Sequence, residues 1–236
     1  MSSELQNDIG RYINYFRSEH KKLLHLEHCL HRKLLVVAML SALAEGRYPN
    51  VRGDKDKFVK LIETYANWPG ATSVSVPQLE MQIKEFCDTG PYGLSENFIN
   101  GLSHRQARWH DRRNRGEIPR LGIDPKPEVI LPEFPTKEEK QLVEDMKHSS
   151  LLYRYRCKLV HEFREPGHGF EFDERDKTPF YHSVMSIDSD SETIELVYPT
   201  QWFLDLPPPI LDGLETHYID TGTNPYDSYD FGSPWR

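Results

Sequence analysis

The stretch LLYRYRCKLVHEFREPG, residues 151–167, constrains the fold and the function more than any other part of the sequence. It reads as the second half of a helix that Pro166 and Gly167 end. Thr136, followed three residues later by Glu139, forms a capping box that predicts where the helix begins. The helix is therefore expected to run from just after Thr136 to about Phe163. Its predicted apolar stripe consists of Leu142, Met146, Ser150, Tyr153, Cys157 and Val160.

Helical periodicity also covers most of the chain before this stretch. Residues 4–45 read as helix almost throughout, with a kink or break expected near residues 18–22. Further helices are predicted over residues 54–67, from Pro77 onward and, with a weaker pattern, over residues 94–115. Residues 116–136 hold five prolines and are expected to form an extended connection over the surface.

The sequence changes character after residue 164. Residues 180–187 and 193–198 have strand-like composition, and the acidic, serine-containing segment DSDSE (residues 188–192) between them indicates a hairpin. A short helix is expected within residues 199–220, followed by an irregular tail. The fold class is therefore predicted as mainly α: a helical bundle over residues 1–164, and an acidic α+β extension over residues 165–236 with a β-hairpin and a short helix.

Composition limits the class of protein. No run of about 18 apolar residues could span a membrane, and the first residues do not resemble a signal peptide. The three cysteines, Cys29, Cys87 and Cys157, are odd in number and widely spaced, which favours a reducing cytoplasm over a disulfide framework. The net charge of −8 combines +4 in residues 1–164 with −12 in residues 165–236, so the helical part could still bind an anion.

The candidate chemistry lies in Arg154, Arg156 and His161. At about 100° per helical residue, Arg154 and His161 are nearly eclipsed, whereas Arg156 and His161 are about 140° apart. A guanidinium can hold a phosphate group in its planar fork, and an imidazole can exchange a proton near pH 7. Together they could cleave RNA with the 2′-hydroxyl as nucleophile and without a metal or cofactor.

Residues 137–164 resemble the HEPN family of all-α domains, which carries an Arg, four to six residues, and then a His. On this resemblance Arg156 matches the Arg and His161 the His, with Arg154 as a rival. Cys157 stands where the family usually has Asn. Phe163 stands where some toxins of the family have a Tyr that a partner nucleotidyltransferase modifies.

The resemblance implies a metal-independent endoribonuclease that acts as a homodimer, with the motifs of two subunits in one cleft. It also implies a role in a toxin–antitoxin or anti-phage system, with an antitoxin or another defence protein as partner. The alternatives are a non-catalytic module that binds nucleotide, nucleic acid or protein, and a helical interaction protein whose Arg and His are structural, pairing with Glu162 and capping carbonyl groups.

Two weaker patterns remain. An arginine-rich segment around Trp109 could bind single-stranded nucleic acid, and the candidate binding residues are Arg105, Arg108, Trp109, Arg112, Arg113 and Arg115. The alternative is a solvated face that pairs with the acidic tail. His25, His28 and His31 recur every three residues but lack a Cys or carboxylate at clear ligand spacing, so we predict no metal site. Motifs of P-loop, Rossmann, zincin and esterase proteins do not occur.

Overall fold

The computed structural model describes residues 2–89, 94–167, 177–185 and 192–228. The helices of the first half are α1 (Ser3–Leu23), α2 (Cys29–Arg47), α3 (Asp54–Tyr65), α4 (Val76–Thr89), α5 (Glu96–Arg105) and α6 (Ala107–Asn114). The elements of the second half are η1 (Leu121–Ile123), α7 (Pro127–Ile130), α8 (Lys137–Asp145), α9 (His148–Glu162), β1 (Phe180–Met185), β2 (Glu192–Val197), α10 (Thr200–Asp205), α11 (Pro207–Thr221) and η2 (Pro225–Ser228). The predicted fold class, mainly α with a small two-stranded sheet and a short C-terminal helix, is confirmed.

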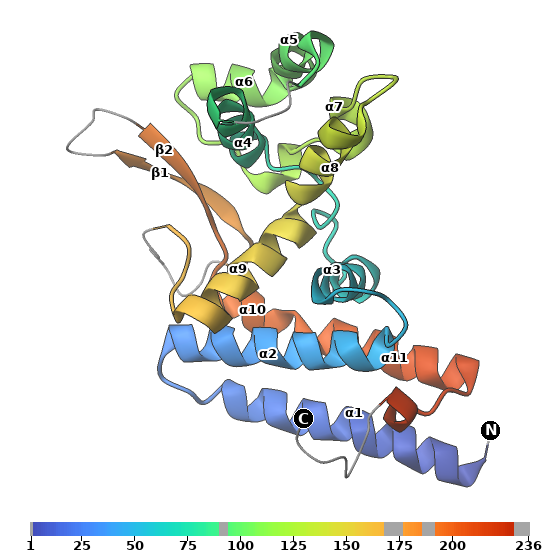
Figure 1. Cartoon of the computed structure of the whole chain (residues 1–236). Helices are drawn as coiled ribbons and strands as arrows, with labels where there is room; N and C mark the ends of the chain where they lie inside the picture. Colours follow the sequence, from blue (N-terminus) through green and yellow to red (C-terminus); the bar gives the residue numbers. More distant parts are fainter. Residues whose placement is uncertain (1, 90–93, 168–176, 186–191, 229–236) are drawn as a thin grey trace.

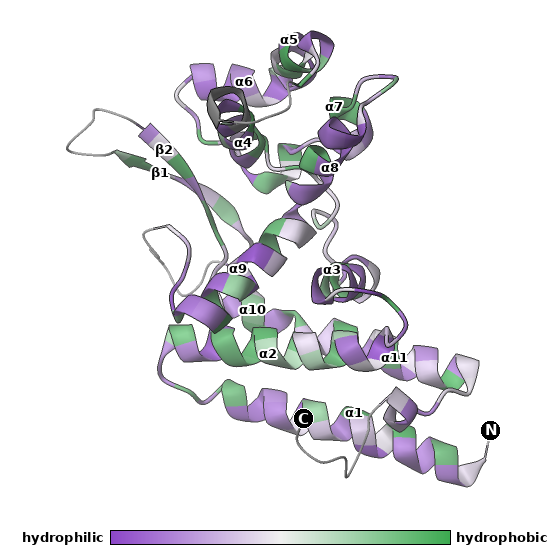
Figure 2. Cartoon of the chain, in the orientation of Figure 1, coloured by the Kyte–Doolittle hydropathy of each residue, from purple (hydrophilic) through white to green (hydrophobic). Residues whose placement is uncertain are grey.

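A helical body forms the lower part of the molecule (Figure 1). Helices α1 and α2 run antiparallel, and α3, α10 and α11 pack around α2. Hydrophobic residues colour much of α2 in Figure 2, because this helix lies between α1 and the rest of the body. Its core includes Val36, Val37, Leu40 and Leu43, which are all fully buried.

A second lobe lies above this body and consists of α4 to α8 (Figure 1). Its core is separate and includes Leu79, Phe98, Val143 and Met146. Helix α9 connects the two parts: its first residues lie at the upper lobe, while Leu152, Tyr155 and Leu159 are buried in the core of the lower body. Residues on α9 are therefore positioned by both lobes.

The hairpin β1–β2 lies beside α9 (Figure 1). The strands are antiparallel, with Phe180 opposite Val197 and Met185 opposite Glu192. Tyr181 and Ile194 face a third small core, in which they meet Val76, Trp109 and Leu121. The predicted strands are confirmed in their placement, and the acidic turn between them falls partly outside the described residues.

Three expectations about helices need correction. The break in residues 4–45 comes at residues 24–28, a few positions after the predicted one. Helices α5 and α6 replace one weak helix, and the connection over residues 116–136 contains η1 and the short α7.

The single helix expected after Thr136 is also interrupted. The capping box is present, with the Thr136 hydroxyl accepting from Glu139 N–H at 3.1 Å. However, α8 ends at Asp145 and α9 begins at His148, because Lys147 pairs with Val74 in an isolated bridge. The interruption changes the phase of the following helix. On α9 the buried apolar residues are Leu152, Tyr155 and Leu159, whereas the predicted stripe residue Val160 is exposed.

The packing also crosses the expected domain boundary at residue 164. Helices α10 and α11 contribute Phe203, Ile210 and Leu214 to the same core as α1, α2 and α3. Arg17 of α1 bonds to both Asp212 and Glu215 of α11, at 2.6 and 2.7 Å. The C-terminal helices are thus part of the lower body rather than an appendage. No helix in the described ranges is long and apolar enough to cross a membrane.

Candidate functional site

The exposed face of α9 carries three of the chain's basic side chains in one line. Arg154, Lys158 and His161 are separated by four and three residues, so they lie about one helical turn apart on the same face. This face lies opposite Leu152, Tyr155 and Leu159, which are buried in the lower body. The side chain of Arg154 is 47% exposed, and its guanidinium lies 3.8 Å from a carboxylate oxygen of Asp145.

A cavity of about 300 Å³ adjoins this face. Arg154 and Lys158 line it from α9, together with Tyr155. The opposite wall comes from β2, with Glu195 among its residues, and from α4. The cavity therefore combines two cations and one carboxylate with two aromatic side chains, Tyr155 and Tyr198, a mixture that can receive a polar ligand with a ring.

His161 lies in the last turn of α9 and is exposed. In the part of the chain that the structure describes, its imidazole has no hydrogen-bond or ion-pair partner. Lys158, one turn earlier, is hydrogen-bonded to Glu162, which Arg164 also contacts at 2.6 Å. The hydrogen bond from Lys158 lowers the pKa of Glu162, so this carboxylate stays charged and competes with any anion for Lys158.

Arg156 points away from this face. Its Nε donates to the Ser41 hydroxyl of α2 at 3.1 Å, and its guanidinium lies 5.7 Å from the centre of the Tyr153 ring. It lines a separate cavity of about 100 Å³, into which Asp54 and Lys57 also project. The structure thus brings Arg154 and His161 together on one face and separates Arg156 from His161, as the helical angles predict.

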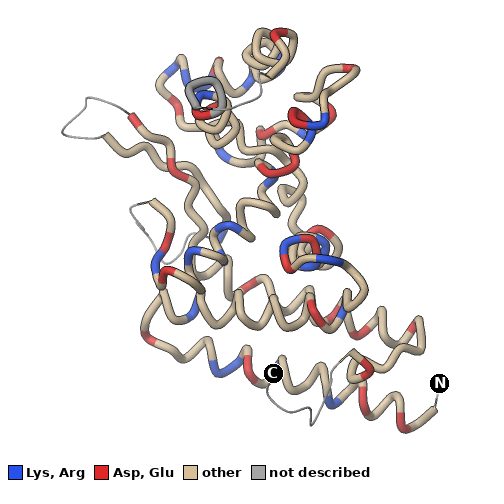
Figure 3. Tube along the Cα trace, in the orientation of Figure 1, with Lys and Arg blue, Asp and Glu red and all other residues tan. Residues whose placement is uncertain are grey.

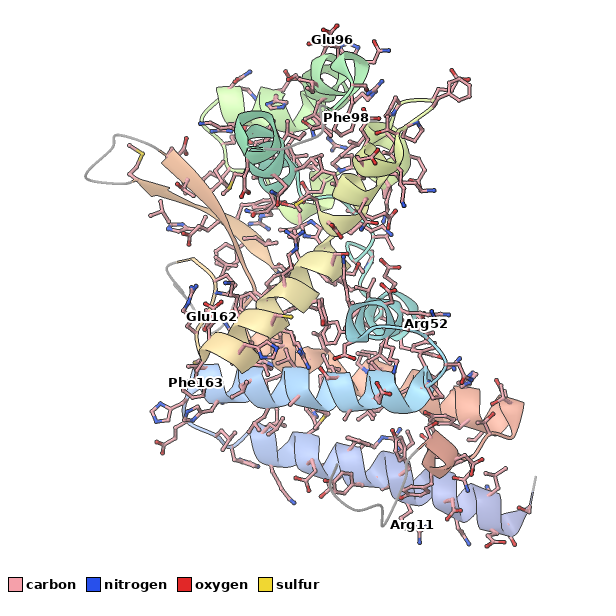
Figure 4. The ribbon with its side chains drawn as sticks, viewed as in Figure 1. Arg11, Arg52, Glu96, Phe98, Glu162 and Phe163 are labelled. Carbon is pink, nitrogen blue, oxygen red and sulfur yellow. The ribbon has the colours of Figure 1, made fainter. Side chains whose placement is uncertain are left out.

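The end of α9 is fixed by a buried ion pair that the sequence did not indicate. Lys33 of α2 is 0% exposed, and its ammonium bonds to Glu165 at 2.8 Å and to the Tyr155 hydroxyl at 3.1 Å. The Tyr155 hydroxyl also donates to Glu165. Phe163 (labelled in Figure 4), at φ 53°, turns the chain out of the helix. The centre of its ring lies 5.9 Å from that of His31. These contacts fix the backbone at the end of α9, from which the exposed side chain of His161 projects.

A second buried polar cluster was equally invisible in the sequence. The His148 ring bonds to Asp124 at 2.8 Å, and the Tyr181 hydroxyl bonds to Asp124 at 2.7 Å and to Ser75 at 2.8 Å. The side chains of Asp124 and His148 are fully buried. Burial raises the pKa of Asp124, and the hydrogen bonds from His148 and Tyr181 oppose this only in part. Because its members come from distant segments, the cluster ties α9 to β1 and to the segment before α4.

The arginine-rich segment does not form an open basic surface. Trp109 is 1% exposed and belongs to a small core with Tyr181, so its ring is not accessible for base stacking. Basic and acidic residues are interspersed in this lobe (Figure 3). Arg112 and Arg115 pair with Glu117 at 2.8 and 3.6 Å, and Arg113 lies 3.7 Å from Glu192.

The other two arginines of this segment differ in their surroundings. Arg105 donates to the Ile130 carbonyl at 3.3 Å, whereas Arg108 is exposed. The charge pairs in this lobe agree with the alternative of a solvated, ion-paired face better than with a nucleic-acid surface.

Two of the regularly spaced histidines, His28 before α2 and His31 in its first turn, pack against each other as rings. His28 and His31 meet edge to face with centroids 5.2 Å apart, and His31 lies 5.9 Å from Phe163. Within the described ranges, no group of three or more His, Cys, Asp or Glu side chains could hold a metal ion.

Comparisons with known proteins do not assign a function to this chain, so the argument about function depends on the site alone. No protein-family description, no curated protein and no solved structure matches the chain. The resemblance of residues 137–164 to the HEPN family therefore enters only as a hypothesis about function.

Proposed function

We propose that this protein is a metal-independent endoribonuclease of the HEPN type. The observation that supports the proposal most is the shared exposed face of Arg154, Lys158 and His161, beside a cavity with an aromatic wall. An arginine and a lysine one turn apart suit a phosphodiester, and a neighbouring imidazole without a partner in the described structure suits proton transfer.

In the proposed reaction the ribose 2′-oxygen attacks phosphorus and the bond to the 5′-oxygen breaks. A base removes the proton of the 2′-hydroxyl, and an acid delivers a proton to the departing 5′-oxygen. The products are a 2′,3′-cyclic phosphate and a 5′-hydroxyl. Arg154 and Lys158 stabilise the additional negative charge on the phosphoryl oxygens, and His161 serves as one of the two proton-transfer groups.

The second proton-transfer group is proposed to come from a second copy of the chain. A twofold axis near the end of α9 would bring two His161 and two Arg154 side chains to one cleft. Val160 and Phe163 are 40% and 56% exposed at this end of the helix, so apolar surface is available there for a partner. The homodimer is thus part of the proposed mechanism.

The resemblance extends the proposal to a biological setting. Ribonucleases of this type must be restrained in the cell that makes them, so an antitoxin or another defence-system protein is the proposed partner. A protein that covers the Arg154–His161 face would block the proposed site directly.

The experiment that tests this proposal is incubation of the wild type with labelled single-stranded RNA in EDTA, followed by analysis of the product ends. The proposal expects cyclic phosphate and 5′-hydroxyl ends. Products with 5′-phosphate ends, or cleavage that requires added Mg²⁺, would contradict the mechanism. Sedimentation should show a dimer at tens of micromolar, and a strict monomer would contradict the shared cleft.

The second candidate function is a module that binds RNA or nucleotide without cleaving it. One observation favours it: Lys158 is already bonded to Glu162, so the face is partly neutralised as it stands. RNA binding that depends on Arg154, without any cleavage product, would select this function.

A further inference from the structure

A second cavity lies away from the α9 face and shares no lining residue with the cavity there. Its volume is about 630 Å³. Four separate segments form it: residues 68–70, residues 118–122, residues 178–181 and Trp202 of α10. The size falls within the range of small-molecule sites in proteins, which is about 300–1,000 Å³.

Four aromatic side chains, from three of these segments, line the cavity. Trp68 and Trp202 meet at an angle of 70° with ring centroids 4.8 Å apart, and Phe180 and Tyr181 line another part of the wall. Trp68 is only partly buried, so part of its indole remains accessible. Such walls bind flat rings by stacking and edge-to-face contact.

Contacts with neighbouring side chains hold two of the aromatic lining residues, Tyr181 and Trp202, in place. Tyr181 is fixed by hydrogen bonds to Asp124 and Ser75. Trp202 stacks on Tyr198 with centroids 5.2 Å apart and an interplanar angle of 27°. Because these side chains are already ordered, a ligand would lose little free energy in arranging them.

The charged side chain in the cavity wall favours an anionic ligand. Arg120 is the one charged residue among its described lining residues. Its side chain is exposed, and no carboxylate pairs with it in the described ranges. The other cavities differ: the one beside α9 includes Glu195, and the one between α4 and β2 includes Glu80 and Glu192.

We propose that this cavity is a nucleotide-binding site, in which the base contacts Trp68 and Trp202 and the phosphate binds Arg120. The combination of a flat ring with an anionic group in one ligand matches the aromatic side chains of the wall and Arg120, which no carboxylate of the described residues pairs with. The same chemistry is offered by a free mononucleotide and by a nucleotide within a single-stranded RNA.

The test is isothermal titration of the full chain with the four nucleoside 5′-monophosphates and with a short single-stranded RNA. Adenosine and inorganic phosphate separate the contribution of the base from that of the anion. Arg120→Gln should weaken mononucleotide binding about tenfold or more, because one charge-assisted contact is lost. The matched control is Arg52→Gln, another exposed arginine, on the connection between α2 and α3 (Figure 4), which should leave binding unchanged.

The outcomes separate this site from the proposed ribonuclease site. Mononucleotide binding that falls in Arg120→Gln and persists in Arg154→Gln supports the proposal, whether or not RNA is cleaved. Binding of RNA alone with the same dependence on Arg120 identifies the strand as the source of the nucleotide. The proposal is overturned if no probe binds at millimolar concentration, if Arg120→Gln and the control Arg52→Gln lose binding equally, or if binding depends on Arg154 instead.

Discussion

The clearest distinction that the structure makes is between Arg154 and Arg156, and their replacement by glutamine should have opposite consequences. The side chain of Arg154 is 47% exposed, and its guanidinium lies 3.8 Å from a carboxylate oxygen of Asp145. Exposed ion pairs of this kind contribute about 0–1 kcal/mol to stability. Arg154→Gln should therefore leave the fold intact.

The same substitution should weaken the proposed RNA contact strongly. A hydrogen bond to a charged group contributes about 1.5–3 kcal/mol, which corresponds to a loss of roughly 10- to 150-fold in affinity or rate. Arg156→Gln removes instead the bond to Ser41 and the contact with the Tyr153 ring. These contacts together stabilise the folded state by about 1–2 kcal/mol, and neither lies on the Arg154–His161 face.

The assay compares the two variants with the wild type in three measurements: urea denaturation, fluorescence anisotropy with a labelled single-stranded RNA, and cleavage of that RNA in EDTA. Arg154→Gln should keep its denaturation midpoint and lose RNA function, whereas Arg156→Gln should lower its midpoint and keep RNA function. If a folded Arg156→Gln variant loses RNA function while Arg154→Gln retains it, the reasoning from helical position is refuted.

Two further predictions concern buried carboxylates. Glu139 is 0% exposed; burial favours a higher pKa, but hydrogen bonds from Ser95 and Thr136 outweigh it and leave the pKa of Glu139 lowered. Glu139→Gln should lower the free energy of unfolding, measured by urea denaturation at pH 7, by about 2 kcal/mol. The difference between variant and wild type should disappear as the pH falls through the pKa of Glu139 in the folded state, which lies below the unfolded value of about 4.3. A difference that grows on acidification would refute this prediction. Glu165→Ala should lower the free energy of unfolding by about 3–5 kcal/mol by breaking the pair with the buried Lys33, whereas the exposed control Glu162→Ala should leave the denaturation midpoint nearly unchanged; equal losses would show that the pair does not fix the end of α9.

Local signals in the sequence predicted much of the fold. The capping box at Thr136 and Glu139 marks the start of α8 as expected, because it depends only on residues three positions apart. The hairpin was also predictable, since alternating strand-like residues flank an acidic turn. The mainly helical class follows from the same kind of local periodicity.

Long-range backbone contacts explain why the sequence did not show the interruption between α8 and α9. His148 N–H donates to the Ser73 carbonyl at 2.9 Å, and Ser75 N–H donates to the Met146 carbonyl at 3.0 Å. These bonds separate α8 from α9 and reset the helical phase, so the predicted stripe through Val160 was wrong on α9. Residues 71–75 carry no pattern that reveals this pairing.

The candidate site was predictable only where it depends on residue spacing within one helix. Spacing alone indicated that Arg154 and His161 share a face, and α9 has them in one regular helix. Spacing could not indicate the cavity beside Arg154, because its other wall comes from β2 and α4. Nor could it show that Trp109 is buried, since Val76 and Tyr181, which belong to the same small core, lie far away in the sequence.

Cleavage of single-stranded RNA by wild type and His161→Ala, side by side in EDTA, tests the central claim most directly. His161 is exposed at the end of α9, so the substitution should leave the urea denaturation midpoint unchanged. Loss of a proton-transfer group should reduce the cleavage rate by about 10²- to 10⁴-fold. A folded His161→Ala variant that cleaves at the wild-type rate would contradict the proposed mechanism.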